Sequence, residues 1–147
     1  MGTQRARGFT LIEMLVVLVV LGILLAILGL NLRPLYRPLN DATNRIEGFL
    51  KQARAKAMAN TSAYRVRYQS GQHRLVAERA KHCGDTAWTV DPQLALDLPP
   101  SVGLHLSDIL CFTSRGYATR PVTLTLTGEH GETRTLAVLL GGAVRRP

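Results

Sequence analysis

The stretch Arg7-Gly8-Phe9-Thr10-Leu11-Ile12-Glu13-Met14-Leu15 opens an apolar run that extends from Phe9 to Leu30. Within that run only Thr10 and Glu13 are polar. About 20 apolar residues, each rising about 1.5 Å along a helix, span the hydrocarbon core of a bilayer. A charged side chain at that depth costs about 2.5–3.5 kcal/mol, so Glu13 needs a partner. The run therefore predicts a transmembrane helix in which one carboxylate has a special role.

The charges before the apolar run indicate its orientation. Arg5 and Arg7 precede it, and residues 1–8 contain no acid. By the positive-inside tendency, the short leader lies in the cytoplasm and the rest of the chain lies outside. A secretory signal peptide would have a shorter apolar region, closed by a small-residue cleavage site. In this sequence the natural break comes before the run, between Gly8 and Phe9.

Residues 7–30 resemble the class III leader of type IV prepilins and type II secretion pseudopilins, because Arg7-Gly8 is followed by Phe9-Thr10-Leu11-Ile12-Glu13. The resemblance implies that a membrane prepilin peptidase cleaves after Gly8 and N-methylates Phe9. It also implies that Glu13, the fifth residue of the mature chain, takes part in assembly with other pilins or pseudopilins in a filament. The implied fold is α+β and pilin-like, with a long N-terminal hydrophobic helix packed on an antiparallel β-sheet head.

Cleavage would supply a partner for Glu13. It frees a positive amine on Phe9 at the same membrane depth, and opposite charges attract strongly where the dielectric constant is low. The amine of one subunit can pair with Glu13 of a neighbour. It can also pair within the chain, because Phe9 and Glu13 lie four residues apart on one helix. The sequence leaves both pairings open.

Composition indicates one small domain after the anchor. The chain has 147 residues and a net charge of +8, and loss of Arg5 and Arg7 with the leader lowers the charge to +6. The 13 Gly and 7 Pro fit a loop-rich β structure better than a helical bundle. We expect four regions: a leader at 1–8, the transmembrane half of the helix at 9–32, its amphipathic half at 33–60, and a β-rich extracytoplasmic head at 61–147.

An amphipathic helix is predicted after the anchor, from about Asp41 to Ala59. Pro34 and Pro38 interrupt the first helix, and Asn40 or Asp41 is expected to cap the restart. Apolar residues recur at three- and four-residue spacing, as expected for one buried helix face. They are Ile46, Phe49, Leu50, Ala53 and Ala57. A basic face remains, which lies near anionic lipid headgroups or faces solvent; it comprises Arg45, Lys51, Arg54 and Lys56.

From Ser62 onward, the alternation of apolar and polar residues predicts short strands separated by turns. The strands are expected at 62–68, 73–79, 86–90, 102–106, 109–113, 122–126, 133–140 and 143–145. Turns are expected at 70–71, 114–117 and 128–131. The remaining residues of 80–101 are predicted to be irregular.

The second half of the chain resembles the GspH/FimT group of minor pilins and pseudopilins. The resemblance rests on Cys111-Phe112-Thr113-Ser114-Arg115-Gly116-Tyr117-Ala118, on the hairpin 122–138, and on Gly142-Ala143-Val144-Arg145. It implies that the last strand, with Arg145 and Arg146, occupies the position where FimT-like members contact DNA. Ala143 departs from the group, since some members carry an arginine at that position.

Cys83 and Cys111 both lie in the exported part of the chain. An oxidising compartment favours a disulfide between them, which would contribute about 3–4 kcal/mol of stability. Two buried free thiols are the alternative.

No group of residues predicts catalysis, a metal site or a cofactor. His82 and Cys83, with Cys111, lack the spacing of metal ligands, and histidines in solvated loops are the simpler interpretation. His105, Ser107 and Asp108 contain the residue types of a hydrolase triad, but they are crowded within four residues and no nucleophile elbow is present. The sequence therefore predicts a protein that is not an enzyme.

DNA is the alternative partner to other pilins and inner-membrane lipid. The excess arginine and lysine residues of the head can contact phosphates, although they can equally form a solvated face or meet acidic neighbours in a filament. We therefore expect a single-pass inner-membrane protein whose N-terminus is cytoplasmic and whose head is periplasmic. It would be a structural minor subunit of a type IV pilus or a type II secretion pseudopilus. A DNA-binding minor pilin for natural transformation is the alternative function.

Overall fold

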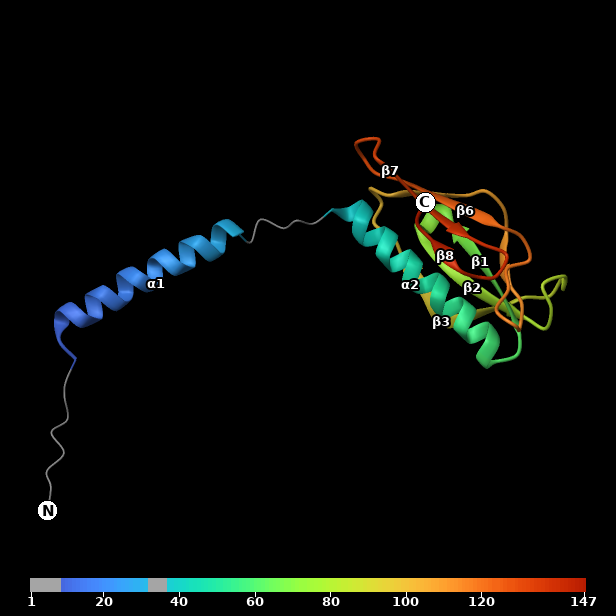
Figure 1. The fold of residues 1–147 in the computed structure, drawn as a ribbon, viewed down its shortest axis with the longest axis horizontal. Helices are drawn as coiled ribbons and strands as arrows, with labels where there is room; N and C mark the ends of the chain where they lie inside the picture. The colour runs from blue at the N-terminus through green and yellow to red at the C-terminus, as the bar shows by residue number, and fades with distance from the viewer. Residues whose placement is uncertain (1–8, 32–36) are drawn as a thin grey trace, which may run out of the picture. The chain divides into compact units, whose positions relative to one another are not determined.

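The computed structural model describes residues 9–31 and 37–147, with the backbone alone for 28–31, and this part of the chain contains two α-helices, one short 3-10 helix and eight strands. Contacts divide the chain into two compact units after Tyr36. The first unit contains helix α1, Leu11–Asn31, and the second contains helix α2, Pro38–Ala59, together with every strand (Figure 1). The head thus includes the amphipathic helix.

Helix α1 contains one charged residue, Glu13, in its first turn. The side chains from Phe9 to Ile27 are exposed. In the described part of the chain, no helix combines the length and the apolar character needed to cross a membrane. The transmembrane segment expected at 9–32 stays a prediction.

Helix α2 begins earlier than the sequence predicted, and its cap is different. Its N-cap is Arg37, which makes no side-chain capping hydrogen bond, so the expected cap at Asn40 or Asp41 is wrong. Pro38 occupies the first turn instead of breaking the helix, because a proline there has no N–H to leave unpaired and its φ already suits a helix. The helix ends at Ala59 as expected, where the Asn60 N–H donates to the Lys56 carbonyl.

The eight strands form two antiparallel sheets of four strands each. The first sheet has the order β3-β2-β1-β5, and the second has the order β4-β6-β7-β8. The strands are β1 Ala63–Gln69, β2 Arg74–Ala80, β3 Thr89–Asp97, β4 Gly103–Leu106, β5 Leu110–Phe112, β6 Val122–Thr127, β7 Thr133–Val138 and β8 Val144–Arg145. A short 3-10 helix, Ser70–Gln72, forms the turn predicted between β1 and β2.

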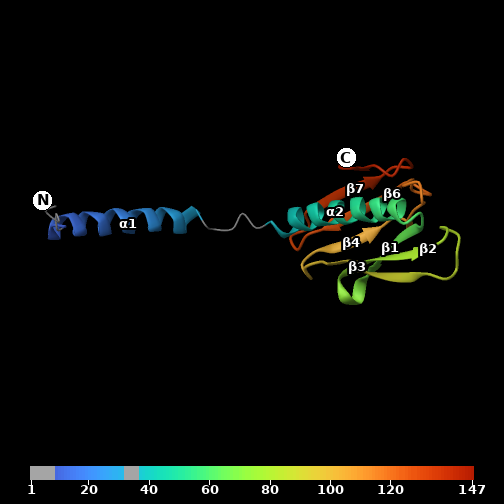
Figure 2. The ribbon, with the colours of Figure 1, turned by 90° about the horizontal axis from the view of Figure 1, so that it is seen from below.

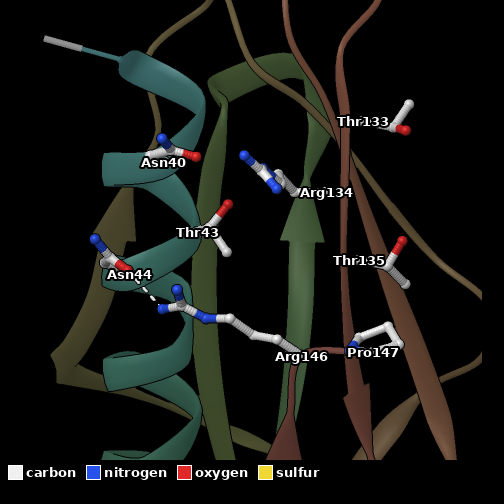
Figure 3. A pocket seen from close by; sticks show the side chains of 8 residues that line it. All are labelled: Asn40, Thr43, Asn44, Thr133, Arg134, Thr135, Arg146 and Pro147. Atoms are coloured by element: carbon white, nitrogen blue, oxygen red, sulfur yellow. Dashed lines mark hydrogen bonds between the residues drawn. The ribbon is translucent and has the colours of Figure 1, made fainter. Parts of the chain in front are cut away.

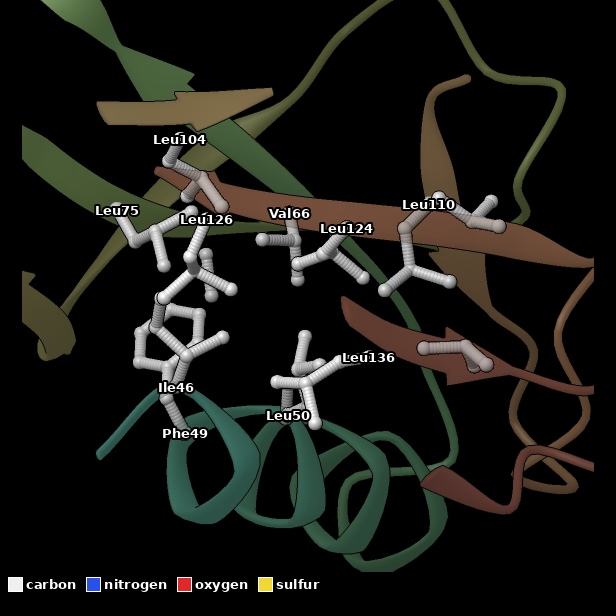
Figure 4. Packing of buried hydrophobic residues seen from close by; sticks show 14 of the residues in the cluster. Ile46, Phe49, Leu50, Val66, Leu75, Leu104, Leu110, Leu124, Leu126 and Leu136 are labelled. Atoms are coloured by element: carbon white, nitrogen blue, oxygen red, sulfur yellow. The ribbon is translucent and has the colours of Figure 1, made fainter. Parts of the chain in front are cut away.

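Helix α2 covers both sheets and closes one hydrophobic core. In Figure 2, β6 and β7 lie on one side of the helix and β1 to β3 lie on the other. Ile46, Phe49 and Leu50 point from α2 into the space between the sheets (Figure 4). They meet aliphatic side chains from both sheets, which include Val66, Leu75, Leu110, Leu124, Leu126 and Leu136. The apolar stripe predicted for the helix is therefore the face that packs into the core of the head.

Strand β3 is the main difference from the predicted strands. It runs from Thr89 to Asp97, whereas the sequence predicted a strand at 86–90 followed by irregular chain. β3 is an edge strand, and Leu94 is its one fully buried side chain. An edge strand tolerates Pro92 because it needs hydrogen bonds on one side only. The usual alternation of apolar and polar residues is therefore too weak here to indicate the strand.

Candidate assembly site and basic head surface

Thr10 and Glu13 form a reciprocal capping box at the start of α1. The backbone N–H of Thr10 donates to Glu13 Oε2 over 3.0 Å, and the Thr10 hydroxyl donates to the same oxygen over 3.1 Å. In return, the Glu13 N–H lies 3.3 Å from Thr10 Oγ1. A Ser/Thr-x-x-Glu pattern before an apolar run is the sequence signal for this motif. The spacing of Thr10 and Glu13 carries that signal, and the amine partner predicted for Glu13 does not account for it.

The capping box leaves half of the Glu13 carboxylate unused. Both of its hydrogen bonds go to Oε2, and no described residue donates to Oε1. Phe9, the residue expected to carry the free amine, is 78% exposed. Gly8, on the other side of the expected cleavage point, lies outside the described residues. Glu13 is thus fixed at the helix start, and its second oxygen has no partner among the described residues.

Cys83 and Cys111 are joined in a disulfide, as the sequence predicted for an oxidising compartment. Their Cα atoms are 6.0 Å apart. Cys83 lies in the loop between β2 and β3, and Cys111 lies in β5. A bonded pair of cysteines has no thiolate to offer, which removes the His82-Cys83-Cys111 metal alternative. His82 instead lies 3.8 Å from Asp85 Oδ1.

A buried carboxylate organises the outer face of the first sheet beside this disulfide. Glu78 is 7% exposed, and it accepts a hydrogen bond from Arg65 Nε over 2.5 Å and one from Arg67 Nη1 over 3.4 Å. The Arg65 guanidinium also stacks on Trp88, 4.4 Å from the ring centroid. Pairing and stacking offset the cost of removing these charges from water.

Two of the four residues of the basic helix face, Arg54 and Lys56, bind the sheets, whereas Arg45 and Lys51 are exposed to solvent as one alternative of the prediction had it. Lys56 Nζ donates to Asp91 Oδ2 over 2.8 Å, and Arg54 Nε donates to the Gly116 carbonyl over 3.0 Å. Lys51 pairs with Glu47 over 2.7 Å. Burial raises the pKa of Asp91, but hydrogen bonds from Lys56, the Gln93 N–H and the Tyr64 hydroxyl outweigh it and hold that pKa below its ordinary value. The two long side chains near the end of α2 therefore tie the helix to the sheets.

The structure separates the two arginines that were predicted as a DNA contact. Arg146 donates to Glu47 Oε2 from Nε and Nη2, over 2.9 and 2.7 Å, and from Nη2 to Asn44 Oδ1 over 2.5 Å. Hydrogen bonds from Lys51 and Arg146 lower the pKa of Glu47. Arg145 is exposed, and its side chain contacts no partner among the described residues. Arg146 is thus bound to α2, whereas Arg145 is available.

Two of the triad-like residues, Ser107 and Asp108 in the turn after β4, have other partners, and His105 lies on β4 itself. Ser107 Oγ accepts from the Thr123 N–H over 2.9 Å, and Asp108 binds Arg120 over 2.9 Å. The hydrogen bond from Arg120 and one from the Ile109 N–H lower the pKa of Asp108. Among the described residues, no cluster of three His, Cys, Asp or Glu side chains could hold a metal ion.

Two of three comparisons with known proteins find a match. Residues 3–29 match the family described as the Prokaryotic N-terminal methylation motif. A search of curated proteins finds no significant match. The solved structure of the type IV minor pilin FimU of Pseudomonas aeruginosa aligns with 74% of this chain and 87% of its own, with a TM-score of 0.60 and 16% identity.

The solved structure of the minor pseudopilin EpsH, from the type II secretion system of Vibrio cholerae, is similar to this chain to the same degree as FimU. It aligns with 77% of this chain and 95% of its own, with a TM-score of 0.60 and 15% identity. At such identities the likeness shows the fold, and it includes the helix covering two antiparallel sheets. The chain therefore joins a prokaryotic N-terminal methylation motif to a head with the fold of the minor pilin FimU and the minor pseudopilin EpsH.

Proposed function

We propose that this protein is a non-enzymatic minor subunit of a type IV pilus or type II secretion pseudopilus. The observation that carries the proposal is a methylation motif at residues 3–29 on a chain whose head has the minor-pilin fold. A prepilin peptidase cleaves between Gly8 and Phe9 and methylates Phe9. The apolar run from Phe9 to Leu30 anchors the subunit in the inner membrane, with the head in the periplasm.

Glu13 provides the assembly contact in this proposal. Its capping bonds to Thr10 fix the carboxylate at the helix start, and no residue that the structure describes donates to Oε1. The amine of a neighbouring subunit, released by cleavage, donates to that oxygen. Because the two charges meet at low dielectric, loss of either one leaves the other costly to bury. The contact therefore favours subunits that have been cleaved.

The test compares Glu13→Gln and Glu13→Leu with the natural chain in cells that contain a prepilin peptidase. Intact mass checks for loss of residues 1–8 and for one added methyl group, and shearing followed by immunoblotting measures incorporation into filaments. We expect both variants to insert and be cleaved but to be lost from the sheared fraction. Incorporation of Glu13→Leu at the natural level would contradict the assembly role.

DNA binding in natural transformation is a second candidate, and the exposure of Arg145 favours it. Its side chain has no partner among the described residues, and phosphate contacts need cations that are free. Gel shifts of the full chain in detergent, over a salt series, test this function. We expect Arg145→Gln to weaken the shift more than Arg146→Gln, because Arg146 is bound to Glu47. No shift at low salt would remove the candidate.

A further inference from the structure

A groove of about 510 Å³ lies between the first turns of α2 and strand β7 (Figure 3). The helix side consists of Asn40, Thr43 and Asn44. The strand side consists of residues 133–135, and Arg146 and Pro147 close one end. The side chains that line the groove carry hydroxyl, amide and guanidinium groups, and none of these lining residues is Asp or Glu.

One edge of β7 is open along this groove. Pairing between β7 and β8 covers Ala137 and Val138 only. The Leu139 N–H donates to the Ala143 carbonyl over 2.9 Å, which shows that odd-numbered residues of β7 direct their N–H and C=O groups toward β8. The backbone groups of Thr133 and Thr135 therefore point to a side where β8 no longer runs; the register places Pro147 opposite Thr135, but no backbone hydrogen bond joins these two described residues. Pro147 has no N–H with which to extend the ladder.

Two cations face the groove beside this open edge. Arg134 points from β7 toward α2 (Figure 3), is exposed, and contacts no partner among the described residues. Arg146 uses Nε and Nη2 for Glu47 and Asn44, so its Nη1 donors stay free. The groove thus combines unpaired backbone groups with the positive charge of Arg134, which has no partner among the described residues, whereas the charge of Arg146 is already matched by Glu47.

We propose that this groove receives an extended segment of another protein that carries an Asp or Glu side chain. The segment adds to β7 by hydrogen bonds with the backbone of Thr133 and Thr135. Because side chains of a strand alternate between faces, its acidic side chain points toward α2 and meets Arg134 and the free side of Arg146. The proposal rests on the proposed function, in which neighbouring subunits supply such segments.

A defined peptide tests the groove directly. The full chain, labelled with 15N in detergent micelles, is titrated with acetyl-Thr-Val-Asp-Val-Thr-amide and with the same peptide carrying Asn in place of Asp. We expect the Thr133 and Thr135 amides to shift and to exchange more slowly, and the Asp peptide to bind about fourfold more tightly, as one exposed ion pair allows. Arg134→Gln should abolish that difference, whereas Arg115→Gln, an exposed arginine outside the groove, should keep it.

Other results would overturn the proposal. They are equal binding of the two peptides, perturbation away from β7, and an Arg134→Gln variant that keeps the preference. A ten-residue thymidine oligonucleotide that shifts the groove resonances where the peptides do not would assign the groove to DNA phosphates instead. Glu13→Gln keeps peptide binding if the groove inference is right. Loss of its incorporation without any peptide binding would refute the groove alone and leave the assembly role standing.

Discussion

Cys83 and Cys111 join two parts of the head that the backbone pairs separately, the loop after β2 and the edge strand β5. In the sheet order β3-β2-β1-β5, strand β1 separates β2 from β5, so the disulfide joins two segments that are not neighbours in the sheet. Cys111 is opposite Arg65 on β1, and Arg65 in turn stacks on Trp88 from the same loop. The covalent bond therefore holds the loop over a charged sheet face.

We expect Cys83→Ser/Cys111→Ser to lower the free energy of unfolding by about 3–4 kcal/mol, since the bond closes a loop with a sequence separation of 28. Urea denaturation of the full chain in detergent, followed by tryptophan fluorescence, measures the change, because Trp88 is the single tryptophan. Reduction of the natural chain should reproduce the effect of the double variant. A midpoint unchanged by either treatment would contradict the expectation.

Glu78 should contribute more to the stability of the head than the exposed residues around it. Glu78→Gln leaves Arg65, whose side chain is 23% exposed, without its counter-charge and should cost about 2 kcal/mol. Arg67→Gln is the matched control, because the Arg67 side chain is 58% exposed and its loss should cost less than about 1 kcal/mol. Equal losses in the two variants, measured by urea denaturation, would show that burial of the pair is unimportant.

Local patterns predicted much of this fold, because each acts over a few residues. Tyr64, Val66 and Tyr68 alternate with arginines, and they form β1 as expected. The apolar stripe of α2 likewise became the core layer. The start of α2 and the edge strand β3 were harder to predict. Pro38 can either break or begin a helix, and β3 buries few side chains on either face.

Contacts distant in sequence could not be predicted in the same way. Arg146 binds Glu47 across a separation of 99 residues, and no periodicity in the sequence joins the residue after the last strand to the middle of α2. The groove beside Arg134 arises because β8 ends after two residues, which is a property of the packed head. The Thr10–Glu13 capping box, by contrast, is local and was readable from the sequence.

Asp91, which accepts a hydrogen bond from Lys56 near the end of α2, should make the stability of the head depend on pH. Its pKa is lowered in the folded head, so its contribution is complete above the ordinary aspartate value of about 4 and is lost as the pH falls through the lowered value. Asp91→Asn should therefore be less stable than the natural chain by about 1–2 kcal/mol at neutral pH. The difference should shrink as the pH falls below about 4, where the natural carboxylate is protonated too. Urea midpoints at several pH values measure this, and a difference independent of pH would contradict it.

Gly142 tests how the last strand is placed, because it meets two constraints at once. Its φ is +75°, and a Cβ there would overlap the carbonyl oxygen of Gly116. Gly131 is the matched control, since its φ is +80° but a Cβ there meets nothing within 4 Å.

Gly131→Ala should cost about 1–2 kcal/mol, the expense of the left-handed conformation alone. Gly142→Ala should cost about 3 kcal/mol or more, because the Gly116 turn must also move. The Gly142 N–H donates to the Leu139 carbonyl over 2.7 Å in the turn that leads into β8. The Gly142→Ala variant should therefore also displace Arg146 from Glu47. Urea denaturation compares the two costs, and the Arg146 Nε resonance reports the displaced ion pair. Equal costs in the two variants would mean that the Gly116 turn yields freely, and that Gly142 does not fix the position of β8.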